Sequence, residues 1–557
     1  MKARTSFLLI LAVGSGLALT WAVAARGSAL DQRSVSTQTA SPPHTLNLNL
    51  AGEPFTLDPA WVTDSISINV VEQLFIGLVD LDDETGEIRP ELATRWTVSV
   101  DRTVYTFTLR NDVTWSDGNP VVAEDVRYGI LRTLDPATQS AWAYPLTSII
   151  KNAGAYNDGA ITDPDQVGVT AVNHTTLRVT LEYPASYVLS ILAMWIARPM
   201  PQWAIEAHGV PTWTEPAHIV TNGPYRLAEW AHDDHILLEK KPTYYDAVNV
   251  QIARVKMWIV DIDTAGQMYL NNQLDIVTVP YTINTPLDPL LRRELHIQPV
   301  PCTYYYGFST SLEPFDNPLV RKAFIAATNR QGLIENVTRG FEQPALTFTS
   351  PGVFGYVDGY AEGIGIPYDP AQAQQWLAAA GYPNGQGLPP ITLWFNSSYG
   401  HEAIAEYVRD NWYTTLGVSV TLQSLPWQEY SDVIGEGEFQ VWRFAWCRDY
   451  RNAHNFLSDA ILHNRGGRFG NWTNSTYDSL VSYAAWEQDP DVRKALYKQA
   501  EEILAETDAV IIPLYFYADG VATRPYLERT CWIGDECDIA AWRFAWRVYL
   551  PLVLRNY

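Results

Sequence analysis

Residues 391–425 place one helical pattern between two strand patterns, and this order restricts the fold more than any other feature of the chain. Residues 391–395 read as a strand, 401–416 as a helix and 419–425 as a second strand. Parallel strands need a crossover connection of this kind, whereas antiparallel strands can be joined by a tight turn. The segment therefore predicts a βαβ unit and an α/β architecture.

Strand and helix patterns alternate along most of the remaining chain, which also favours an α/β protein. The length of 557 residues is too great for one ordinary domain, so we expect two or three lobes. A hydrophobic share of 47% can support substantial cores. Strands are expected at 45–50, 104–109, 176–181, 226–230, 236–239, 255–259, 275–279 and 511–517, and helices at 64–78, 123–134, 263–272, 319–328, 369–380 and 492–506.

The N-terminal residues 1–25 have the composition of a secretory signal peptide. Lys2 and Arg4 precede an apolar run over 7–25, and Ala22 and Ala24 form an A-x-A-like cleavage site. An uncleaved membrane anchor is the alternative, because the run is long. No cysteine lies near the cleavage region, which excludes a lipid-modified cysteine there. Residues 26–44 are rich in Ser, Thr, Gln and Pro and predict a flexible tether.

Four cysteines in an exported chain favour disulfide bonds over a metal site. Cys302, Cys447, Cys531 and Cys537 permit three complete pairings. A bridge between Cys531 and Cys537 closes the shortest loop and leaves Cys302 for Cys447. Chain entropy alone gives a bridge across so long a loop a stabilisation of roughly 5 kcal/mol.

The charge and the absence of catalytic motifs narrow the function. A formal net charge of −24 argues against nucleic acid as a partner. The chain has no G-x-S-x-G in its mature region, no H-E-x-x-H, no Walker loop and no C-x-x-C. We therefore predict that the protein is not an enzyme and needs neither a cofactor nor a metal. The enzyme alternative is a secreted glycoside hydrolase, because acidic residues are plentiful and the chain has 21 tryptophans.

Residues 90–130 carry the longest recognisable motif, PELATRWTVSVDRTVYTFTLRNDVTWSDGNPVVAEDVRYGI. Asp117 and Gly118 form a turn, and Glu124 and Asp125 favour the start of a helix. The motif resembles the signature of the bacterial extracellular solute-binding proteins of family 5, the peptide- and nickel-binding group. Similar family blocks follow at 219–227, 240–247, 317–330, 368–383 and after residue 492, so the resemblance covers almost the whole mature chain.

Two blocks, PCTYYYGFST at 301–310 and AWCRDYRNAHNFL at 445–457, are similar to the oligopeptide-binding branch of that family. In that branch the two cysteines of these blocks are bonded, which implies a Cys302–Cys447 bridge. The resemblance also implies that Asp449 receives the α-ammonium of a bound peptide, because a dehydrated ammonium needs a charged partner. It further implies that the preceding strand pairs with the peptide backbone through Ala445 and Cys447. For Asp449 the alternative is a surface or capping carboxylate.

Five further positions match ligand-contacting residues of the branch. Trp427 and Trp446 match aromatic walls of the pocket, and Tyr517 matches a tyrosine near the ligand, with core packing as the alternative for each. Arg443 and His401 match residues that receive the peptide carboxylate, and a guanidinium suits that group through its fork of donors. A surface ion pair is the alternative for Arg443 and His401.

Two positions depart from the family pattern. Ile434 stands where the branch carries a second arginine. Thr63 stands where the family carries a carboxylate, with Asp64 beside it. These departures bear on the preferred length and polarity of the ligand.

The resemblance implies a type II periplasmic-binding-protein-like fold, with two lobes around a ligand cleft and an extra domain. It implies a monomeric, exported component of an ABC importer, in the periplasm or at the outer face of the membrane, that captures short peptides and delivers them to the permease. The same fold with another solute, an oligosaccharide or a nickel chelate, is the alternative. The expected lobes are 45–75, 202–301 and 518–557 for lobe I, 76–201 for the extra domain, and 302–517 for lobe II.

Overall fold

The computed structural model describes residues 45–545 except 83–84, 86, 280–286, 339, 398–399, 436–438, 463–466 and 531–536. The expected signal peptide (1–25) and tether (26–44) lie outside the described residues, as does Cys531. Within the described part of the chain, no helix combines the length and apolar character needed to cross a membrane.

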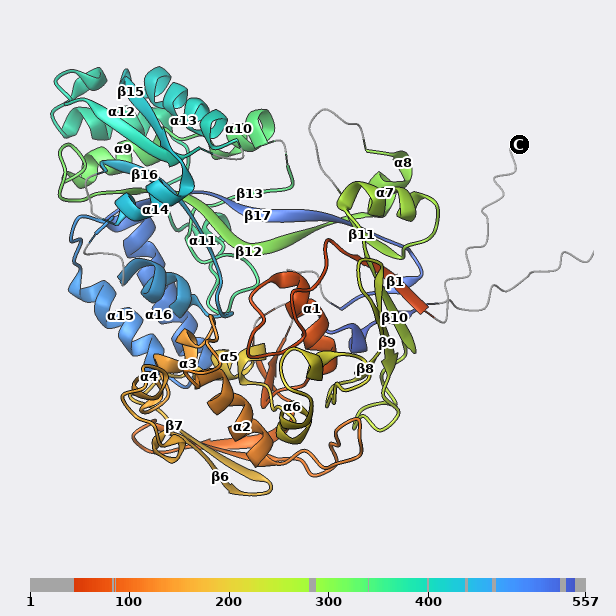
Figure 1. Cartoon of the computed structure of the whole chain (residues 1–557). Coiled ribbons are helices and arrows are strands. Elements are labelled where there is room, and N and C mark those ends of the chain that lie inside the picture. Colours follow the sequence, from red (N-terminus) through yellow and green to blue (C-terminus); the bar gives the residue numbers. More distant parts are fainter. Residues whose placement is uncertain are drawn as a thin grey trace, which may run out of the picture. The chain divides into compact units, whose positions relative to one another are not determined.

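The first sheet has four strands in the order β1 (Thr45–Leu50), β10 (Arg254–Ile259), β9 (His235–Lys240) and β8 (Tyr225–Ala231). Strand β1 pairs in parallel with β10, and the other neighbours are antiparallel (Figure 1). All four strands were expected, β1 from its alternating pattern. Helix α1 (Ser65–Leu74) follows β1 and begins at Asp64, whose carboxylate accepts the Ser67 N–H.

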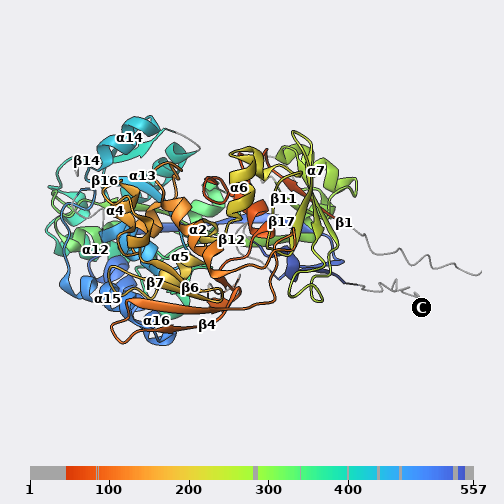
Figure 2. The same ribbon diagram turned by 60° about the horizontal axis from the view of Figure 1, so that its bottom comes forward.

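The second sheet has the order β4 (Ala93–Val98), β5 (Val104–Leu109), β7 (Thr176–Thr180) and β6 (Val169–Asn173). Helix α2 (Ala123–Leu134) contains the expected helix and packs near β6 and β7 (Figure 2). Its first turn is held by Asp125, whose carboxylate accepts the Val122 N–H at 2.9 Å and the Trp115 indole N–H at 3.0 Å. The family motif at 90–130 therefore builds a strand pair, a turn and a capped helix.

The third sheet has the order β11 (Ile276–Thr278), β17 (Ile511–Thr523), β12 (Leu295–Phe308), β16 (Val441–Cys447), β14 (Ile391–Asn396) and β15 (Val420–Leu425), with β13 (Gln343–Pro344) beside β17. Strands β14 and β15 pair in parallel, and α13 (His401–Leu416) connects them. This confirms the predicted βαβ unit. The long strands β12 and β17 run side by side, with a register shift between Pro299 and Thr303.

Helices cover both faces of the third sheet. In β12, Tyr304 and Tyr306 belong to one buried cluster, whereas Tyr305 belongs to another. This is the alternation of a strand that is buried on both faces. The first cluster contains residues of α9 (Pro318–Ala326), α12 (Pro370–Ala379) and α13, and the second contains residues of α14 (Trp427–Ile434), α15 (Ser475–Trp486) and α16 (Pro490–Glu502).

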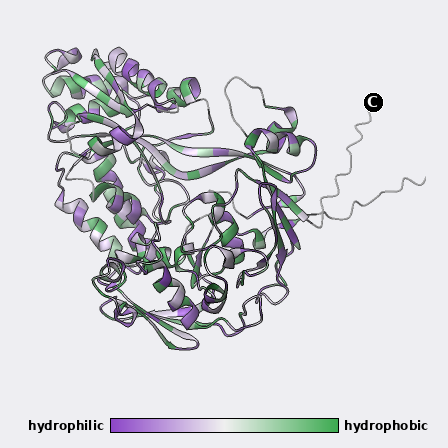
Figure 3. Cartoon of the chain, in the orientation of Figure 1, coloured by the Kyte–Doolittle hydropathy of each residue, from purple (hydrophilic) through white to green (hydrophobic). Residues whose placement is uncertain are grey.

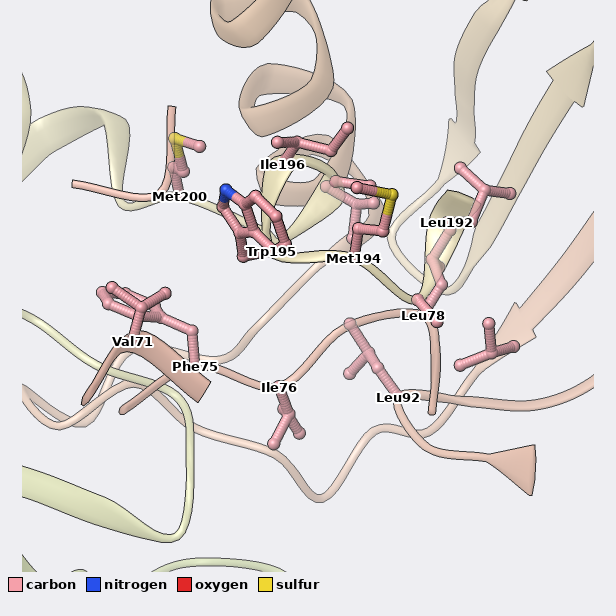
Figure 4. Packing of buried hydrophobic residues seen from close by; sticks show 14 of the residues in the cluster. Val71, Phe75, Ile76, Leu78, Leu92, Leu192, Met194, Trp195, Ile196 and Met200 are labelled. Atoms are coloured by element: carbon pink, nitrogen blue, oxygen red, sulfur yellow. The ribbon is translucent and has the colours of Figure 1, made fainter. Parts of the chain in front are cut away.

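A third cluster joins the first two sheets. Figure 4 shows Val71 and Phe75 of α1 near Trp195 and Met200, which follow the short helix α5 (Val188–Leu192). Elsewhere the helices carry hydrophobic and hydrophilic residues side by side, as expected for helices that bury one face (Figure 3).

Several predicted boundaries are wrong. The helix expected over 64–78 ends at Leu74, because Phe75 adopts an extended conformation at the C-cap. The strand expected over 511–517 continues to Thr523, since its far end pairs with β11 and with the start of β12. The helix expected over 492–506 ends at Glu502 and continues as a wider π-helical segment, Ile503–Thr507.

Candidate ligand-binding site

A disulfide bond fixes the end of the strand that leads to Asp449. Cys302 of β12 and Cys447 of β16 are bonded and are also register partners in the antiparallel pair. The predicted Cys302–Cys447 pairing is therefore confirmed. Cys537 is also disulfide-bonded.

Strand β16 is paired along its whole length on one side only. It pairs with β12 from Val441 to Cys447, whereas its pairing with β14 is confined to Val441 and Trp442. At Arg443 the Tyr430 hydroxyl takes the place of a strand neighbour: it accepts the Arg443 N–H at 3.0 Å and donates to the Arg443 carbonyl at 2.6 Å. Beyond Arg443, the described strands leave this edge of β16 open.

The open edge presents the backbone groups of Ala445 and Cys447. Alternate residues of a strand direct their N–H and C=O groups to the same side. Because those of Arg443 face Tyr430, those of Ala445 and Cys447 face the same open side. The structure therefore gives both residues the geometry needed to pair with an added extended chain.

Asp449 lies two residues beyond the strand, half-buried, at a cavity of about 850 Å³. Its Oδ2 accepts a hydrogen bond of 2.9 Å from the Asn455 side-chain amide. On another wall of the cavity, burial and then the charge of Asp449 raise the pKa of Tyr144. The carboxylate thus faces an aromatic hydroxyl group and a volume large enough for a small organic group.

Two parts of the chain that are distant in sequence form this cavity. One wall comes from α3 (Tyr144–Thr147) and residues 183–187, and the other comes from residues 446–462 and α15. The Ser186 N–H donates to the Ala485 carbonyl at 2.6 Å and so joins the two walls. The Tyr187 ring stacks on His454, with centroids 3.9 Å apart. The lining includes Asp449 and Asp459 and contains no lysine or arginine among the described residues, so the cavity favours a cationic group.

Arg443, His401 and Tyr517 meet in a second cluster, around Tyr304. The Arg443 side chain is buried, its guanidinium carbon lies 4.4 Å from the centre of the Tyr304 ring, and its Nη1 donates to Asn396 at 3.0 Å. His401 Nδ1 lies 3.2 Å from the Tyr304 hydroxyl. The Tyr517 ring lies 6.3 Å from that of Tyr304.

In the Arg443 cluster, the guanidinium is a buried positive charge with no anionic partner among the described residues. Within the described part of the chain, no carboxylate forms a salt bridge with Arg443. Burial, and then the charge of Arg443, lower the pKa of His401 to about 4, so the imidazole is neutral near pH 7. A buried guanidinium with a free donor would gain from an anionic ligand, and its fork suits a carboxylate.

The two predicted tryptophans lie in different environments. Trp446 borders the Asp449 cavity, and its indole N–H donates to Asn455. Trp427 is 50% exposed at the start of α14, and its ring lies 6.1 Å from that of Phe444. Phe444 and Arg443 are neighbours in β16 and face opposite sides. Among the described residues, the ring neighbours of Trp427 are Tyr430 and Phe444, and neither belongs to the Arg443 cluster.

The departures from the family pattern have structural counterparts. Ile434 is buried at the end of α14 within the second cluster of the third sheet. Asp64, next to Thr63, is the N-cap of α1, because it binds both the N–H and the hydroxyl of Ser67 at 2.8 Å. Asn455 lies in the block at 445–457 but was not predicted as a site residue, and Tyr144 was not predicted either because it comes from a segment distant in sequence.

A comparison with protein families matches residues 87–467 to the bacterial extracellular solute-binding proteins, family 5. The chain belongs to this family. It is 32% identical over 499 residues to the oligopeptide-binding protein OppA of Bacillus subtilis, covering 88% of this chain and 89% of that protein. It is 33% identical over 491 residues to the probable deoxycholate-binding periplasmic protein YgiS of Escherichia coli, covering 87% of this chain and 90% of that protein.

Solved structures of the family share the fold. The unliganded open form of MppA, a periplasmic murein tripeptide-binding protein, matches with a TM-score of 0.83 and 31% identity, covering 90% of this chain and 98% of that chain. The protein therefore has the family's periplasmic-binding-protein fold, as predicted. Within the described residues, no group of three or more His, Cys, Asp or Glu side chains could hold a metal ion.

Proposed function

We propose that this protein is the exported substrate-binding component of an ABC importer and that it captures short peptides. The observation that carries the proposal is the chemistry along one strand: β16 has a buried guanidinium near its centre, an open edge beyond it, and a carboxylate at a cavity after its end. An extended peptide has the complementary order of groups, with a carboxylate, a hydrogen-bonding backbone and an ammonium.

Asp449 would bind the ligand's α-ammonium. The carboxylate supplies the charge that an ammonium needs when it leaves water. Trp446 and the tyrosines of the cavity would enclose the first side chain without polar specificity. The backbone of Ala445 and Cys447 would pair with the peptide and give affinity that does not depend on its sequence.

Arg443 and His401 would receive the peptide carboxylate, with Tyr517 beside them. A strand rises roughly 3.3 Å per residue, so the open edge from Ala445 to Cys447 would pair with about three residues of an extended peptide. The loss of the second arginine at Ile434 leaves Arg443 as the guanidinium at this end.

The two long strands would act as the hinge. The register shift between Pro299 and Thr303 in β12, opposite Phe516 and Ala518 in β17, supports lobe boundaries near 301 and 517. Lobe I would then comprise 45–75, 202–301 and 518–557, the extra domain 76–201, and lobe II 302–517. Rotation about this hinge would close a monomer around its ligand and present it to the permease, with no bond made or broken.

Calorimetric titration with a three- or four-residue peptide tests the proposal. Asp449→Asn should weaken binding of the free-amine peptide by about 100-fold, because a buried ammonium would lose its charged partner. The N-acetylated peptide should bind weakly to both the parent and the variant. Asp410→Asn is the matched control, since Asp410 is an exposed carboxylate paired with Arg409. Equal affinity of the parent and Asp449→Asn for the free-amine peptide would refute the role of Asp449.

A second candidate is the same fold with a different solute. The aromatic lining of the Asp449 cavity and the relationship to YgiS, whose name refers to deoxycholate, favour this alternative. Native mass spectrometry of the purified protein distinguishes the two. A co-purified peptide supports peptide capture, and a sterol or sugar supports the alternative.

A further inference from the structure

Asn455 is buried beneath Asp449 and uses its whole hydrogen-bonding capacity. Its side chain has no exposed surface. Its Oδ1 accepts the Trp446 indole N–H and the Asp449 backbone N–H, each at 3.0 Å. Its Nδ2 donates to Asp449 Oδ2 at 2.9 Å and to Asp459 Oδ2 at 3.1 Å. One amide therefore contacts the indole, the backbone and the carboxylate of the segment that reaches the cavity.

Few side chains can make this set of contacts. A carboxamide has one oxygen with two lone pairs and one nitrogen with two N–H groups, and all four are used here. The orientation of the amide is fixed, because its oxygen faces two N–H donors and its nitrogen faces two carboxylates. A leucine of similar size would make none of these bonds, and an aspartate would place a third carboxylate between Asp449 and Asp459.

The link to Asp459 anchors the amide from the far side. Asp459 Oδ2 also accepts the Tyr450 hydroxyl at 2.8 Å, and the Tyr450 ring is buried and stacked 5.8 Å from that of Tyr187. The chain of contacts thus runs from Asp449 through Asn455 and Asp459 to the aromatic wall of the cavity. It connects the carboxylate to packed core and not only to its own loop.

We propose that Asn455 is a positioning residue that fixes the rotamer of Asp449 and the plane of Trp446 for a cationic ligand group. This inference rests on the proposed role of Asp449 as the ammonium receptor. A carboxylate already held in place does not lose rotamer freedom when the ligand binds, so pre-organisation raises affinity for the charged amine. The Asn455 amide also places an uncharged hydrogen-bond donor between the carboxylates of Asp449 and Asp459.

Calorimetric titration of Asn455→Leu with one tripeptide, in free-amine and N-acetylated forms, tests the proposal. The free-amine affinity should fall by about tenfold, because an oriented charge-assisted contact is lost. Binding of the acetylated peptide should change by less than about twofold, since it does not use the carboxylate. An equal loss for both peptides, or no loss for the free amine, would overturn the positioning role.

Two further variants keep the test decisive. Asn455→Ser is the substitute if the leucine variant does not fold. A serine side chain is too short to reach Asp449 and Asp459 together, so this variant should show the same selective loss of free-amine affinity. Asn452→Leu is the matched control: Asn452 is 1% exposed in the same loop and binds the His454 N–H and the Tyr497 hydroxyl instead of Asp449. It should lower the melting temperature without changing the ratio of the two affinities. A changed ratio in Asn452→Leu would show that any disturbance of the loop suffices and would overturn the proposal.

The double variant Asp449→Asn/Asn455→Leu separates this inference from the proposed function. If Asn455 acts through Asp449, the double variant should bind the free-amine peptide as weakly as Asp449→Asn alone. Fully additive losses would overturn the positioning role while leaving the ammonium role of Asp449 intact. If Asp449→Asn by itself binds as the parent does, the proposed function fails and the positioning role fails with it.

Discussion

Asp449 follows the end of β16 and Arg443 lies within β16, but the two charged side chains have different surroundings. Asp449 is half-buried, and its carboxylate is hydrogen-bonded at the wall of a large cavity. Arg443 is 7% exposed, lies over an aromatic ring and forms no salt bridge with a described carboxylate. The Asp449 carboxylate is therefore hydrogen-bonded by a donor of the protein, whereas the Arg443 guanidinium has no carboxylate partner among the described residues. This difference suggests that the two ends contribute to binding by different physical routes.

The largest expected effect concerns stability near the Asp449 end, because the Cys302–Cys447 disulfide joins β12 to β16 there. Replacing Cys302 and Cys447 together by alanine should lower the free energy of unfolding by about 2–5 kcal/mol, since the bridge closes a long loop in the unfolded chain. Urea unfolding followed by circular dichroism measures the change. A loss below about 1 kcal/mol would show that β12–β16 pairing alone fixes this end.

Arg443→Met sharpens the comparison at the other end. Affinity for a peptide with a free carboxyl terminus should fall by about 10–100-fold, because the ligand anion would lose a charge-assisted partner. The same peptide as a C-terminal amide should be affected by less than about threefold. Titration of both peptides against parent and variant checks this. Similar losses for the acid and the amide would mean that Arg443 supports the fold and not the carboxylate.

His401 makes the Arg443 end sensitive to acid. Its pKa is lowered to about 4 in the folded protein, against about 6.5 in an unfolded chain. The unfolded state therefore binds more protons between these values, and the contribution of this group to stability declines as the pH falls from about 6.5 to about 4. Urea unfolding at several pH values should show a shallower decline in His401→Gln than in the parent. Parallel curves for the two proteins would contradict the low pKa.

The smallest expected effect belongs to Trp427. Half of this residue is exposed, and its nearest ring neighbours are Phe444 and Tyr430. Trp427→Ala should change the free energy of unfolding by less than about 1 kcal/mol and peptide affinity by less than about threefold. A tenfold loss of affinity would show that the ring contacts ligand after the lobes close.

Local patterns in the sequence predicted much of the fold. The strands at 45–50, 104–109 and 391–396, and the helices at 123–134 and 401–416, lie within about one residue of their expected places. The long strand β12 was not predicted, because Pro299, Pro301 and the polar residues near its start interrupt the two-residue alternation expected of a strand. The end of α1 was also misplaced, since the apolar run continues beyond Leu74 while the backbone becomes extended.

The proposed site residues came from resemblance rather than from a local pattern, and the structure explains why. Arg443 of β16 and Tyr517 of β17 approach each other through the pairing of both strands with β12, and His401 joins them from α13 by its contact with Tyr304. No local period encodes such a meeting. Tyr144 was missed for the same reason, whereas Asn455 lies only six residues from Asp449 and was missed because no periodic pattern encodes the loop that brings the two together.

The sequence alone determined the α/β class, the βαβ unit, the acidic charge and the resemblance to one family, because these depend on short-range periodicity, composition and contiguous motifs. Only the tertiary structure decided which charges are buried, which edge of β16 is open and which amide holds Asp449. Burial and hydrogen bonding depend on segments brought together from distant parts of the chain, so they are properties of the packed molecule.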